Sequence, residues 1–440
     1  MLSGCWKAPA PISPVSRSDR EVGGADRIPS PRIQTAAIRA TGCLRMIGRT
    51  LMVGQSGGAT AVINATLAGV IAAGRASGVF NRILGLKHGT QGFFDEQFVD
   101  LTDLGDSALD ALRKTPSAAL GTSRQKLDDD RIVVALDVMD RHHCDAFVLI
   151  GGNDSADSAL RFHEQAGSTG RELSVVLAPK TVDNDLVETD HCPGYASAAK
   201  AFANIVRDAT YDSIAAPWLY PVKFIDVMGR DAGWLAASGD LGFGDGEADL
   251  RPLLVLPERP PASGESLVEE IGVAVRDRGW VVCVLPETLR DASGSHLSGD
   301  FPDSVDPFGH PYQMPPAVTM TAMTRSMLGI NARFERPGSS IRMSMSMASP
   351  VDLREAYDAG RAAAGAVASG ESGRMISLQR RQAPDYEMSY GQCLLDLVAN
   401  QVRLLDERFI ATNGRATTGA FREYALPLLG KNPFPPYFRM

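Results

Sequence analysis

The sequence predicts an α/β protein with two domains, each built from a mainly parallel sheet flanked by helices. At 440 residues the chain is too long for one ordinary hydrophobic core. From residue 50 onward, strand-like and helix-like segments alternate. The strand-like segments are apolar runs without polar alternation, which is typical of strands that are covered on both faces in a parallel sheet.

Six segments have the character of buried strands. They place a first α/β domain at residues 46–190, a second at 215–345, and a C-terminal segment at 346–440 that packs back on both. The expected strands are "TLMVGQ" (50–55), "DAFVLI" (145–150), "LSVVLAPK" (173–180), "YPVKFIDV" (220–227), "RPLLVLPE" (251–258) and "WVVCVLPE" (280–287).

Helical patterns follow several of these strands. Ile63, Leu67, Val70 and Ile71 repeat at the spacing of a helix that lies on a sheet. "SADSALRFHEQA" predicts a helix that begins at Ser155, and "ESLVEEIGVAVRDRG" predicts another after the fifth strand. Each such unit brings a turn to the carboxyl end of a strand, which is where α/β proteins bind ligands.

Residues 1–45 differ from the rest of the chain. The stretch "APAPISPVSRSDREVGGADRIPSPR" is rich in Pro, Ser and Arg and has no apolar period, which predicts a disordered extension. A transit peptide is an alternative, but Asp19, Glu21 and Asp26 oppose it. A further interpretation is that Met46 is the true first residue.

The bulk composition excludes several classes of protein. Hydrophobic residues make up 44% and charged residues 22% of the chain, as is ordinary for a folded globular protein. A net charge of -8 argues against a nucleic-acid or membrane-surface role, although a site can be locally basic on an acidic protein. The cysteines form no CxxC pair, and no apolar run of about 18 residues occurs. We expect a cytoplasmic protein without a zinc site, a disulfide framework or a membrane span.

Two glycine-rich turns directly follow expected strands. "GQSGGAT" (54–60) offers exposed N–H groups at a helix start, which suits a phosphate, although a tight packing turn is an equal alternative. "GGNDS" (151–155) adds Asp154, whose carboxylate would hold a divalent metal or exclude a larger anion from a phosphate site. Helix capping by Asn153, Asp154 or Ser155 is the alternative for this turn.

The turn "PKTVDNDL" (179–186) follows the next strand along the chain. One strand-helix-strand unit separates Asp154 from Lys180, so we expect both at the same carboxyl edge of neighbouring parallel strands. Lys180 would then neutralise a phosphate that Asp154 repels. Asp183 and Asp185 would point to one side of an extended segment, where a carboxylate can take a proton from a substrate hydroxyl. Structural acids of an Asx-turn are the alternative.

A fourth turn, "DVMGRDAGWLA" (226–236), ends a strand of the second domain and opens a helix. Gly229 lets the backbone bend, and the Arg230 guanidinium has the fork geometry that suits a phosphate. Glu287 offers an acceptor for sugar hydroxyls, and the basic stretch "ARFERPGSSIR" (332–342) adds guanidinium groups. A basic loop is usually only solvated, which is the alternative for this stretch.

In this order and spacing, "SGG", "GTSR", "GGNDS", "PKTVDND" and "MGR" resemble the motifs of the phosphofructokinase family. The resemblance covers about residues 50–345. It implies two similar α/β domains that hold a phosphoryl donor and fructose 6-phosphate across the cleft between them. It also implies that the phosphoryl group passes to the 1-hydroxyl of the sugar.

The resemblance assigns roles to single residues. It makes Gly58 a donor-phosphate contact and Arg124 a phosphate-bridging arginine, with Asp183 as the base and Asp185 near the metal. Asn153 stands where an aspartate usually helps to coordinate Mg²⁺, so a metal contact there would run through its carbonyl or a water. The sugar-binding set that the resemblance implies consists of Thr181, Val182, Asp183, Met228, Gly229, Arg230, Glu287, Arg333 and Arg342.

Asp154 and Lys180 indicate the donor within this resemblance. ATP-using members usually have glycine at both positions, whereas pyrophosphate-using members have Asp and Lys. Asp154 would repel the α-phosphate of ATP, and Lys180 would supply the charge that pyrophosphate needs in the transition state. The resemblance therefore implies Asp183, Lys180 and Asp154 as the catalytic residues of a pyrophosphate-dependent type.

Three further positions depart from the family pattern. Ala59 replaces a frequent aspartate, and Ser339 in "GSSIR" replaces a histidine that contacts the sugar. Pro221 stands where members usually have an arginine, which leaves Lys223 as a substitute. These changes bear on the identity of the acceptor more than on the reaction.

The implied reaction is a Mg²⁺-dependent, reversible transfer from pyrophosphate to fructose 6-phosphate, which yields fructose 1,6-bisphosphate and phosphate. The family also implies a homodimer or homotetramer in which arginines of a neighbouring subunit often complete the sugar site. One alternative is a non-catalytic regulatory subunit of the same fold, which the intact Asp183 and Asp185 oppose. Another is an enzyme that uses ATP, or a sugar phosphate such as sedoheptulose 7-phosphate.

Overall fold

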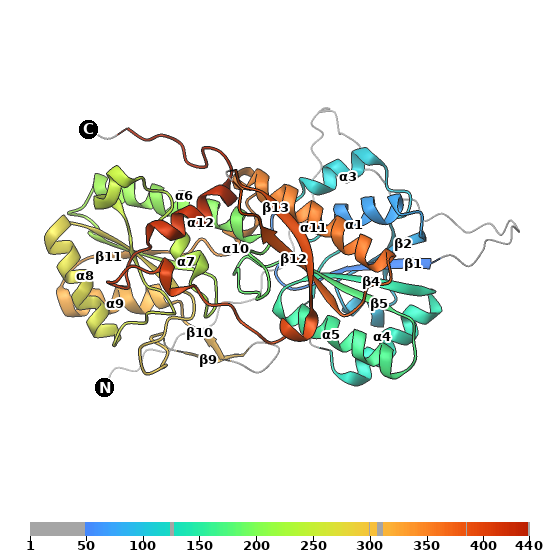
Figure 1. Ribbon diagram of the computed structural model, residues 1–440. Coiled ribbons are helices and arrows are strands. Elements are labelled where there is room, and N and C mark those ends of the chain that lie inside the picture. Colours follow the sequence, from blue (N-terminus) through green and yellow to red (C-terminus); the bar gives the residue numbers. More distant parts are fainter. Residues whose placement is uncertain (1–48, 124–126, 299, 306–310, 384, 439–440) are drawn as a thin grey trace, which may run out of the picture. The chain divides into compact units, whose positions relative to one another are not determined.

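Two larger sheets organise the part of the chain that the structure describes, and helices cover both faces of each (Figure 1). The structure is a computed structural model that describes residues 49–438 except 124–126, 299, 306–310 and 384. Arg124, Met46 and the predicted extension at 1–45 therefore lie outside the described residues. The predicted α/β class, with mainly parallel sheets flanked by helices, is confirmed.

The first sheet contains the expected strands at 50–55, 145–150 and 173–180. Its inner strands run parallel, and an antiparallel strand closes each edge. In spatial order the strands are β13 (Met388–Leu394), β12 (Arg374–Arg380), β5 (Ser174–Pro179), β4 (Cys144–Gly151), β1 (Arg49–Gln55), β2 (Phe80–Leu86) and β3 (Phe98–Asp100).

Alternate residues of these strands supply two apolar layers, one on each face of the sheet. Leu51 and Val53 of β1 pack with the helices of one face, whereas Met52 between them packs with those of the other. This double burial explains why the strands have no polar alternation. The helices are α1 (Ile63–Ala76) and α11 (Pro350–Ala368) on one face and α4 (Asp129–Arg141) and α5 (Asn153–Ser168) on the other (Figure 1).

The second sheet is parallel throughout and contains the three remaining expected strands, of which the segment at 251–258 forms only a short one. Its order is β11 (Ala332–Glu335), β6 (Val222–Val227), β8 (Val281–Pro286) and β7 (Leu253–Leu254). One apolar layer contains α6 (Tyr195–Ala215), α7 (Trp234–Ser238) and α12 (Gly419–Leu429), and the other contains α8 (Gly264–Arg278) and α9 (Pro316–Leu328).

The C-terminal part of the chain contributes to the layers of both sheets. Strands β12 and β13 extend the first sheet, and α12 packs against α6. Residues 47–440 group into one unit by their contacts, so the boundaries at 46–190, 215–345 and 346–440 stay a prediction. Short described elements include α2 (Gln91–Phe94), α3 (Asp106–Arg113), α10 (Ser339–Met343), and the pair β9 (Asp300–Val305) and β10 (Pro311–Gln313).

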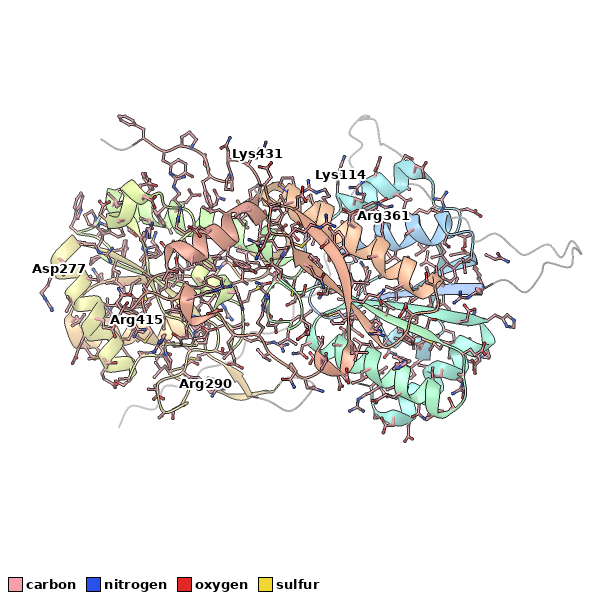
Figure 2. The ribbon with its side chains drawn as sticks, viewed as in Figure 1. Lys114, Asp277, Arg290, Arg361, Arg415 and Lys431 are labelled. Carbon is pink, nitrogen blue, oxygen red and sulfur yellow. The ribbon has the colours of Figure 1, made fainter. Side chains whose placement is uncertain are left out.

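Charged side chains project into solvent from the outer helices. Exposed examples are Asp277, Arg361 and Lys114, of which Lys114 directly follows α3 (Figure 2). Among the described helices, none is both long and apolar enough to cross a membrane.

Candidate active site

The turns that the sequence singled out in the first sheet lie at the carboxyl ends of β1, β4 and β5. Gln55 pairs with Ile150, and Gly151 pairs with Pro179, in parallel register. The turns that carry Asp154 and Lys180 therefore follow neighbouring strands at one edge of the sheet, as expected from the single strand-helix-strand unit between them.

Lys180 links the ends of three strands. Its side chain is buried, and its Nζ donates a hydrogen bond to the carbonyl oxygen of Gly58 at 2.8 Å. Its backbone N–H donates to the carbonyl oxygen of Gly151 at 2.9 Å. Gly57 has φ of 75°, and a Cβ there would lie 3.3 Å from the same ammonium group, so glycine suits this position. A positive charge is thus fixed beside the turn that precedes α1.

The glycine-rich turn at residues 54–60 both precedes α1 and offers hydrogen-bond donors to a ligand. Thr60 stabilises the turn before α1, whose N-cap is Val62, because the Oγ1 of Thr60 accepts hydrogen bonds from the N–H groups of Val62 at 3.3 Å and Ile63 at 3.0 Å. Within the described chain, no hydrogen bond uses the N–H groups of Gly58 and Ala59. Two backbone donors beside an ammonium group form a place where an anion can bind.

Asp154 is not a helix cap. Helix α5 begins at Asn153, two residues before the predicted start, because Gly152 is the N-cap and no side chain caps the helix. Ser155 is buried, and its hydroxyl packs where a Cβ of Gly151 would lie. The Asp154 side chain is 91% exposed, and its Oδ2 lies 4.0 Å from Nη2 of Arg230. The carboxylate is therefore free either to bind a ligand or to repel an anion.

Asn153 already has partners in the C-terminal part of the chain. Its Oδ1 accepts a hydrogen bond from the N–H of Asn400 at 2.9 Å, and its amide nitrogen donates to the carbonyl oxygen of Gln401. One lone pair of the Asn153 oxygen is thus used. Its predicted contact with Mg²⁺ stays a prediction, and it would have to use the other lone pair or a water.

Asp183 lies in a site that favours a proton. Burial, first of all, and then the charges of Asp185 and Glu287 raise the pKa of Asp183 to about 7, against the opposing charges of Arg230 and Lys180. The hydroxyl of Thr181 accepts the N–H of residue 183 at 3.1 Å, so the turn is closed by Thr181 rather than by the aspartate. The Asx-turn alternative therefore does not describe Asp183.

Asp185 is a buried carboxylate with an open oxygen. Burial raises its pKa. Among the described residues its Oδ1 has no hydrogen-bond partner, and they include no group of three or more His, Cys, Asp or Glu arranged to hold a metal. Mg²⁺ needs no such group, since it commonly binds through one or two carboxylates, substrate phosphates and waters. The oxygen donors of this loop thus fit a magnesium ion.

Asn184 holds the loop between the two acids. Its backbone has φ of 57°, in the left-handed region that Asn tolerates better than most residues. Its buried side chain accepts the N–H of Cys192 at 2.9 Å and donates to the hydroxyl of Tyr424 at 3.0 Å. The orientation of the acids therefore depends on a residue of α12, far away in the sequence.

Residues at the carboxyl ends of β6 and β8 contribute to the same site. Gly229 follows Met228 with φ of 139°, and a Cβ there would lie 2.9 Å from the carbonyl oxygen of Ala232, so only glycine fits. Arg230 and Glu287 act electrostatically on Asp183, the first lowering and the second raising its pKa. The site thus draws on both sheets.

Arg333 and Arg342, the two arginines that the resemblance assigns to the 6-phosphate of the sugar, lie at different places in this chain. The carbonyl oxygen of Arg342, in α10, accepts the N–H of Ala61 at 2.7 Å, which places Arg342 beside the turn before α1. Arg333 lies near the amino end of β11, with its guanidinium carbon 3.4 Å from the ring centre of Tyr220. Arg230, by contrast, follows the carboxyl end of the neighbouring strand β6.

Lys223 is not available as a substitute for the missing arginine. Its side chain is buried at the amino end of β6, where its Nζ lies 2.5 Å from Oδ2 of Asp212 and 3.2 Å from Oε1 of Glu335. The expectation that it replaces the arginine at the position of Pro221 is wrong for this conformation, because two carboxylates already neutralise its charge.

Sequence reasoning missed the residues that support the loop from the C-terminal part of the chain. Arg403 donates hydrogen bonds to the carbonyl oxygens of Asn184, Thr189 and Asp190. Tyr424 also donates from its hydroxyl to the Asp190 carbonyl oxygen at 2.9 Å. No motif or spacing marks these residues, since their partners lie more than 200 positions away.

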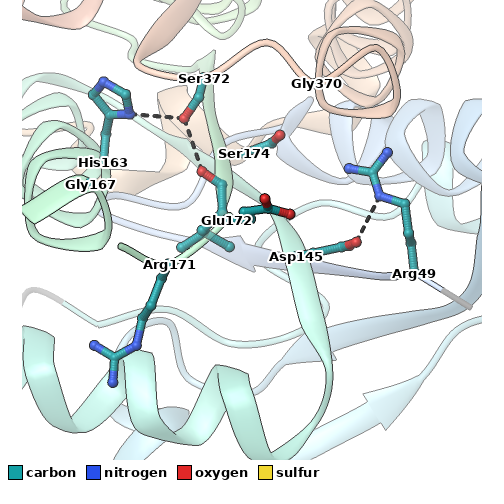
Figure 3. A pocket seen from close by; sticks show the side chains of 10 residues that line it. Arg49, Asp145, His163, Gly167, Arg171, Glu172, Ser174, Gly370 and Ser372 are labelled. Carbon is teal, nitrogen blue, oxygen red and sulfur yellow. Dashed lines mark hydrogen bonds and ion pairs between the residues drawn. The ribbon is translucent and has the colours of Figure 1, made fainter. Parts of the chain in front are cut away.

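A cavity of about 500 Å³ lies elsewhere, near the amino ends of β1, β4 and β5 (Figure 3). Its two arginines are paired with aspartates of this chain. Nε of Arg49 lies 2.8 Å from Oδ2 of Asp145, and Nε of Arg171 lies 2.8 Å from Oδ2 of Asp140. This cavity is separate from the acids and the lysine described above.

Comparison with known proteins agrees with this geometry. Residues 50–339 match the family model described as Phosphofructokinase. A relative from Xanthomonas campestris pv. campestris (strain B100), named pyrophosphate–fructose 6-phosphate 1-phosphotransferase, is 34% identical over 390 residues, which cover 87% of this chain and 92% of the relative. A relative of the same name from Halomonas elongata is 33% identical over 396 residues, which cover 87% of this chain and 92% of that relative.

A solved structure extends the likeness to three dimensions. The crystal structure of a pyrophosphate-dependent phosphofructokinase from Nitrosospira multiformis is 31% identical, with a TM-score of 0.78, and the match covers 89% of this chain and 94% of that one. The sequence motifs, the two sheets and these matches lead to one conclusion: the chain belongs to the phosphofructokinase family.

Proposed function

We propose that this protein catalyses the Mg²⁺-dependent, reversible transfer of a phosphoryl group from pyrophosphate to the 1-hydroxyl of fructose 6-phosphate. The observation that carries the proposal is the position of Lys180, whose buried ammonium group lies at the glycine-rich turn, 2.8 Å from the Gly58 carbonyl oxygen. The relatives whose names state this reaction support it.

The donor side is formed by two glycine-rich turns. Pyrophosphate takes hydrogen bonds from the N–H groups at Gly58, and Lys180 neutralises the charge that develops as the bridging bond breaks. Asp154 disfavours a third phosphate, because its exposed carboxylate would repel the α-phosphate of ATP. Arg124, which the family resemblance makes a phosphate-bridging arginine, lies outside the described residues.

Asp183 is the base of the transfer step. The 1-hydroxyl oxygen of the sugar forms a bond to the terminal phosphorus of pyrophosphate, and the bond from that phosphorus to the bridging oxygen breaks. Orthophosphate leaves with the electron pair, and the hydroxyl proton passes to a carboxylate oxygen of Asp183. A pKa of about 7 suits this role, because a base is most effective when its pKa lies near the working pH.

The loop at residues 182–190, which we call the acid loop, would hold Mg²⁺. Asp185 would bind it through Oδ1, the buried oxygen without a partner in the described chain, and Asn153 would contribute through its free lone pair or a water. When bound, the ion neutralises negative charge on the phosphate oxygens. Removal of the metal with a chelator tests whether the reaction needs Mg²⁺, and it should abolish turnover until Mg²⁺ is restored.

The sugar side is formed by residues from both sheets. Fructose 6-phosphate is bound by Arg230, Glu287, Met228 and Gly229. Thr181 and Val182, where the acid loop begins, complete this set. Arg342 is assigned to the 6-phosphate. Arg333, which lies at the amino end of β11, is assigned to the sugar site of a neighbouring copy.

That assignment requires the homodimer or homotetramer expected from the family. Light scattering on the purified protein measures the mass, and a monomer at assay concentration would contradict it. The expected cytoplasmic location also stays a prediction.

Phosphorus NMR tests the reaction directly. Purified protein with Mg²⁺, pyrophosphate and fructose 6-phosphate should convert the pyrophosphate signal into orthophosphate and a new signal at the 1-position of the sugar. The reverse mixture should regenerate pyrophosphate. Transfer to a different hydroxyl would contradict the acceptor assignment, and no transfer would favour the regulatory-subunit alternative.

A further inference from the structure

A single side chain from the C-terminal part of the chain binds the backbone of the acid loop. Nη1 of Arg403 donates hydrogen bonds to the carbonyl oxygens of Thr189 and Asp190, both at 2.6 Å. Its Nη2 and Nε donate to the carbonyl oxygen of Asn184 at 2.7 and 3.2 Å. The backbone N–H of Arg403 donates to the carbonyl oxygen of Asp185 at 2.7 Å. One arginine therefore engages four carbonyl groups of the loop.

The loop needs such support because it is not part of a longer regular element. Residues 182–190 form neither helix nor strand, so their carbonyl groups have few partners of their own. Fixing each residue of such a segment costs conformational entropy. Asn184 also holds a left-handed backbone conformation. Hydrogen bonds from outside the loop are what offset these costs.

Arg403 is itself held firmly on the side of the second sheet. Its guanidinium lies over the ring of Trp234 at 4.6 Å, and its carbonyl oxygen accepts the indole N–H of the same residue at 3.0 Å. Two residues later, the N–H of Leu405 donates to Oε1 of Glu258 at 2.7 Å, and this oxygen also accepts the N–H of Gly233 at 2.8 Å. The arginine is thus tied to the start of α7, just after Arg230.

Asn400, three residues before Arg403, contacts helix α5 beside the turn that carries Asp154. The N–H of Asn400 donates to Asn153, and its Nδ2 donates to Oδ1 of Asp157 at 2.9 Å. Residues 400–405, which we call the strap, thus contact the first turns of α5, the acid loop and α7 in succession. The strap lies beyond residues 50–339, which match the family model.

We propose that Arg403 is a positioning residue for phosphoryl transfer, which fixes the acid loop so that Asp183 and Asp185 face the glycine-rich turn at residues 54–60. The inference rests on the proposed function, and it adds a role for a segment outside the family motifs. Arg403 touches neither substrate in this account. It acts through the carbonyl groups that set the direction of the loop.

The test compares three variants of the full-length protein. Arg403→Met removes the charge and the hydrogen bonds, whereas Arg403→Lys keeps the charge but loses the planar fork. Arg408→Met is the matched control, since Arg408 lies nearby in sequence, its side chain is 68% exposed and its Nε lies 3.3 Å from Oδ2 of Asp406.

We expect the change to appear in kcat rather than in KM. Misplacement of a catalytic group by about 1 Å costs about 100-fold in rate, so Arg403→Met should lower kcat by roughly that factor with KM for both substrates nearly unchanged. Arg403→Lys should retain an intermediate kcat, and Arg408→Met should match the wild type. A wild-type kcat in Arg403→Met, or a loss confined to KM, would overturn the proposal.

Hydrogen exchange gives a measurement that does not depend on turnover. Peptides that cover residues 183–194 should exchange faster in Arg403→Met and Arg403→Lys than in the wild type and in Arg408→Met. Unchanged exchange in both Arg403 variants would contradict the positioning role. If the wild type fails to use pyrophosphate, the proposed function fails, while the exchange rates still decide whether Arg403 fixes the loop.

Discussion

The two ends of the parallel strands differ in how their charges are satisfied. At the amino ends, Nε of Arg171 lies 2.8 Å from Oδ2 of Asp140, and Nζ of Lys223 lies 2.5 Å from Oδ2 of Asp212. At the carboxyl ends, burial raises the pKa of Asp183 to about 7, and Oδ1 of Asp185 has no hydrogen-bond partner among the described residues.

This difference separates structural charges from functional ones. A buried carboxylate without a partner is costly, so it persists where a proton, a metal or a substrate completes it. A paired charge has no such need. The cavity at the amino ends has a volume of about 500 Å³, yet its arginines already bind aspartates (Figure 3). Chemistry is therefore expected at the carboxyl ends, where charges are left for a ligand.

The largest expected effect is at Asp183. Asp183→Asn removes the base, and because general-base catalysis contributes about 10²- to 10⁴-fold, kcat should fall within that range. The fold should persist. Initial rates with pyrophosphate and fructose 6-phosphate measure the loss, and far-UV circular dichroism checks the fold. A folded variant with the wild-type rate would remove the base assignment.

Replacement of Asp154 and Lys180 together should have the next largest effect. In the double variant Asp154→Gly and Lys180→Gly, the loss of a charged donor should lower kcat/KM for pyrophosphate about 10²- to 10³-fold. The ratio of pyrophosphate to ATP activity should fall as well. If both the rate and the ratio stay as in the wild type, these two residues do not select the donor.

The pH dependence should reveal Asp183 in two ways. Activity should fall as the pH drops below about 7, because the base becomes protonated.

The free energy of unfolding should depend on pH in the opposite direction. Since the pKa is raised from 3.8 to about 7, the folded state binds this proton more tightly than the unfolded state, and the contribution of Asp183 to stability falls as pH rises through that window.

Urea unfolding at two pH values measures this contribution. Asp183→Asn should be more stable than the wild type at pH 8 and should lose most of that advantage at pH 5. An Asn variant that is less stable than the wild type at pH 8 would contradict the raised pKa.

The smallest expected effect is at the amino ends. Asp140→Asn breaks an ion pair with Arg171 in which the aspartate side chain is 56% exposed. Such surface pairs contribute about 0–1 kcal/mol, so the free energy of unfolding should change by no more than that and the rate should stay unchanged. A rate loss comparable to that of Asp183→Asn would remove the distinction between the two ends.

The sequence predicted the features that depend on local pattern. The strands, and the placement of Lys180 and Asp154 at one edge, follow from apolar runs and the geometry of parallel strands. The helix start was less accurate, because Gly152 and not a polar side chain forms the cap of α5.

Contacts between distant segments could not be predicted in this way. Arg403 and Thr189 are 214 positions apart, and no motif relates them. Arg333 illustrates a second limit, because a basic residue on a strand can lie at either end of it. Lys223 illustrates a third, since only the folded chain reveals that Asp212 and Glu335 neutralise it.

Donor preference measures directly whether Asp154 and Lys180 select pyrophosphate. Initial rates of the purified wild-type protein with fructose 6-phosphate and Mg²⁺ should be compared with pyrophosphate and with ATP at equal concentration. Asp154 and Lys180 predict a strong preference for pyrophosphate. A preference for ATP would contradict the account, because it would mean that the charges at the carboxyl ends of β4 and β5 do not select the donor.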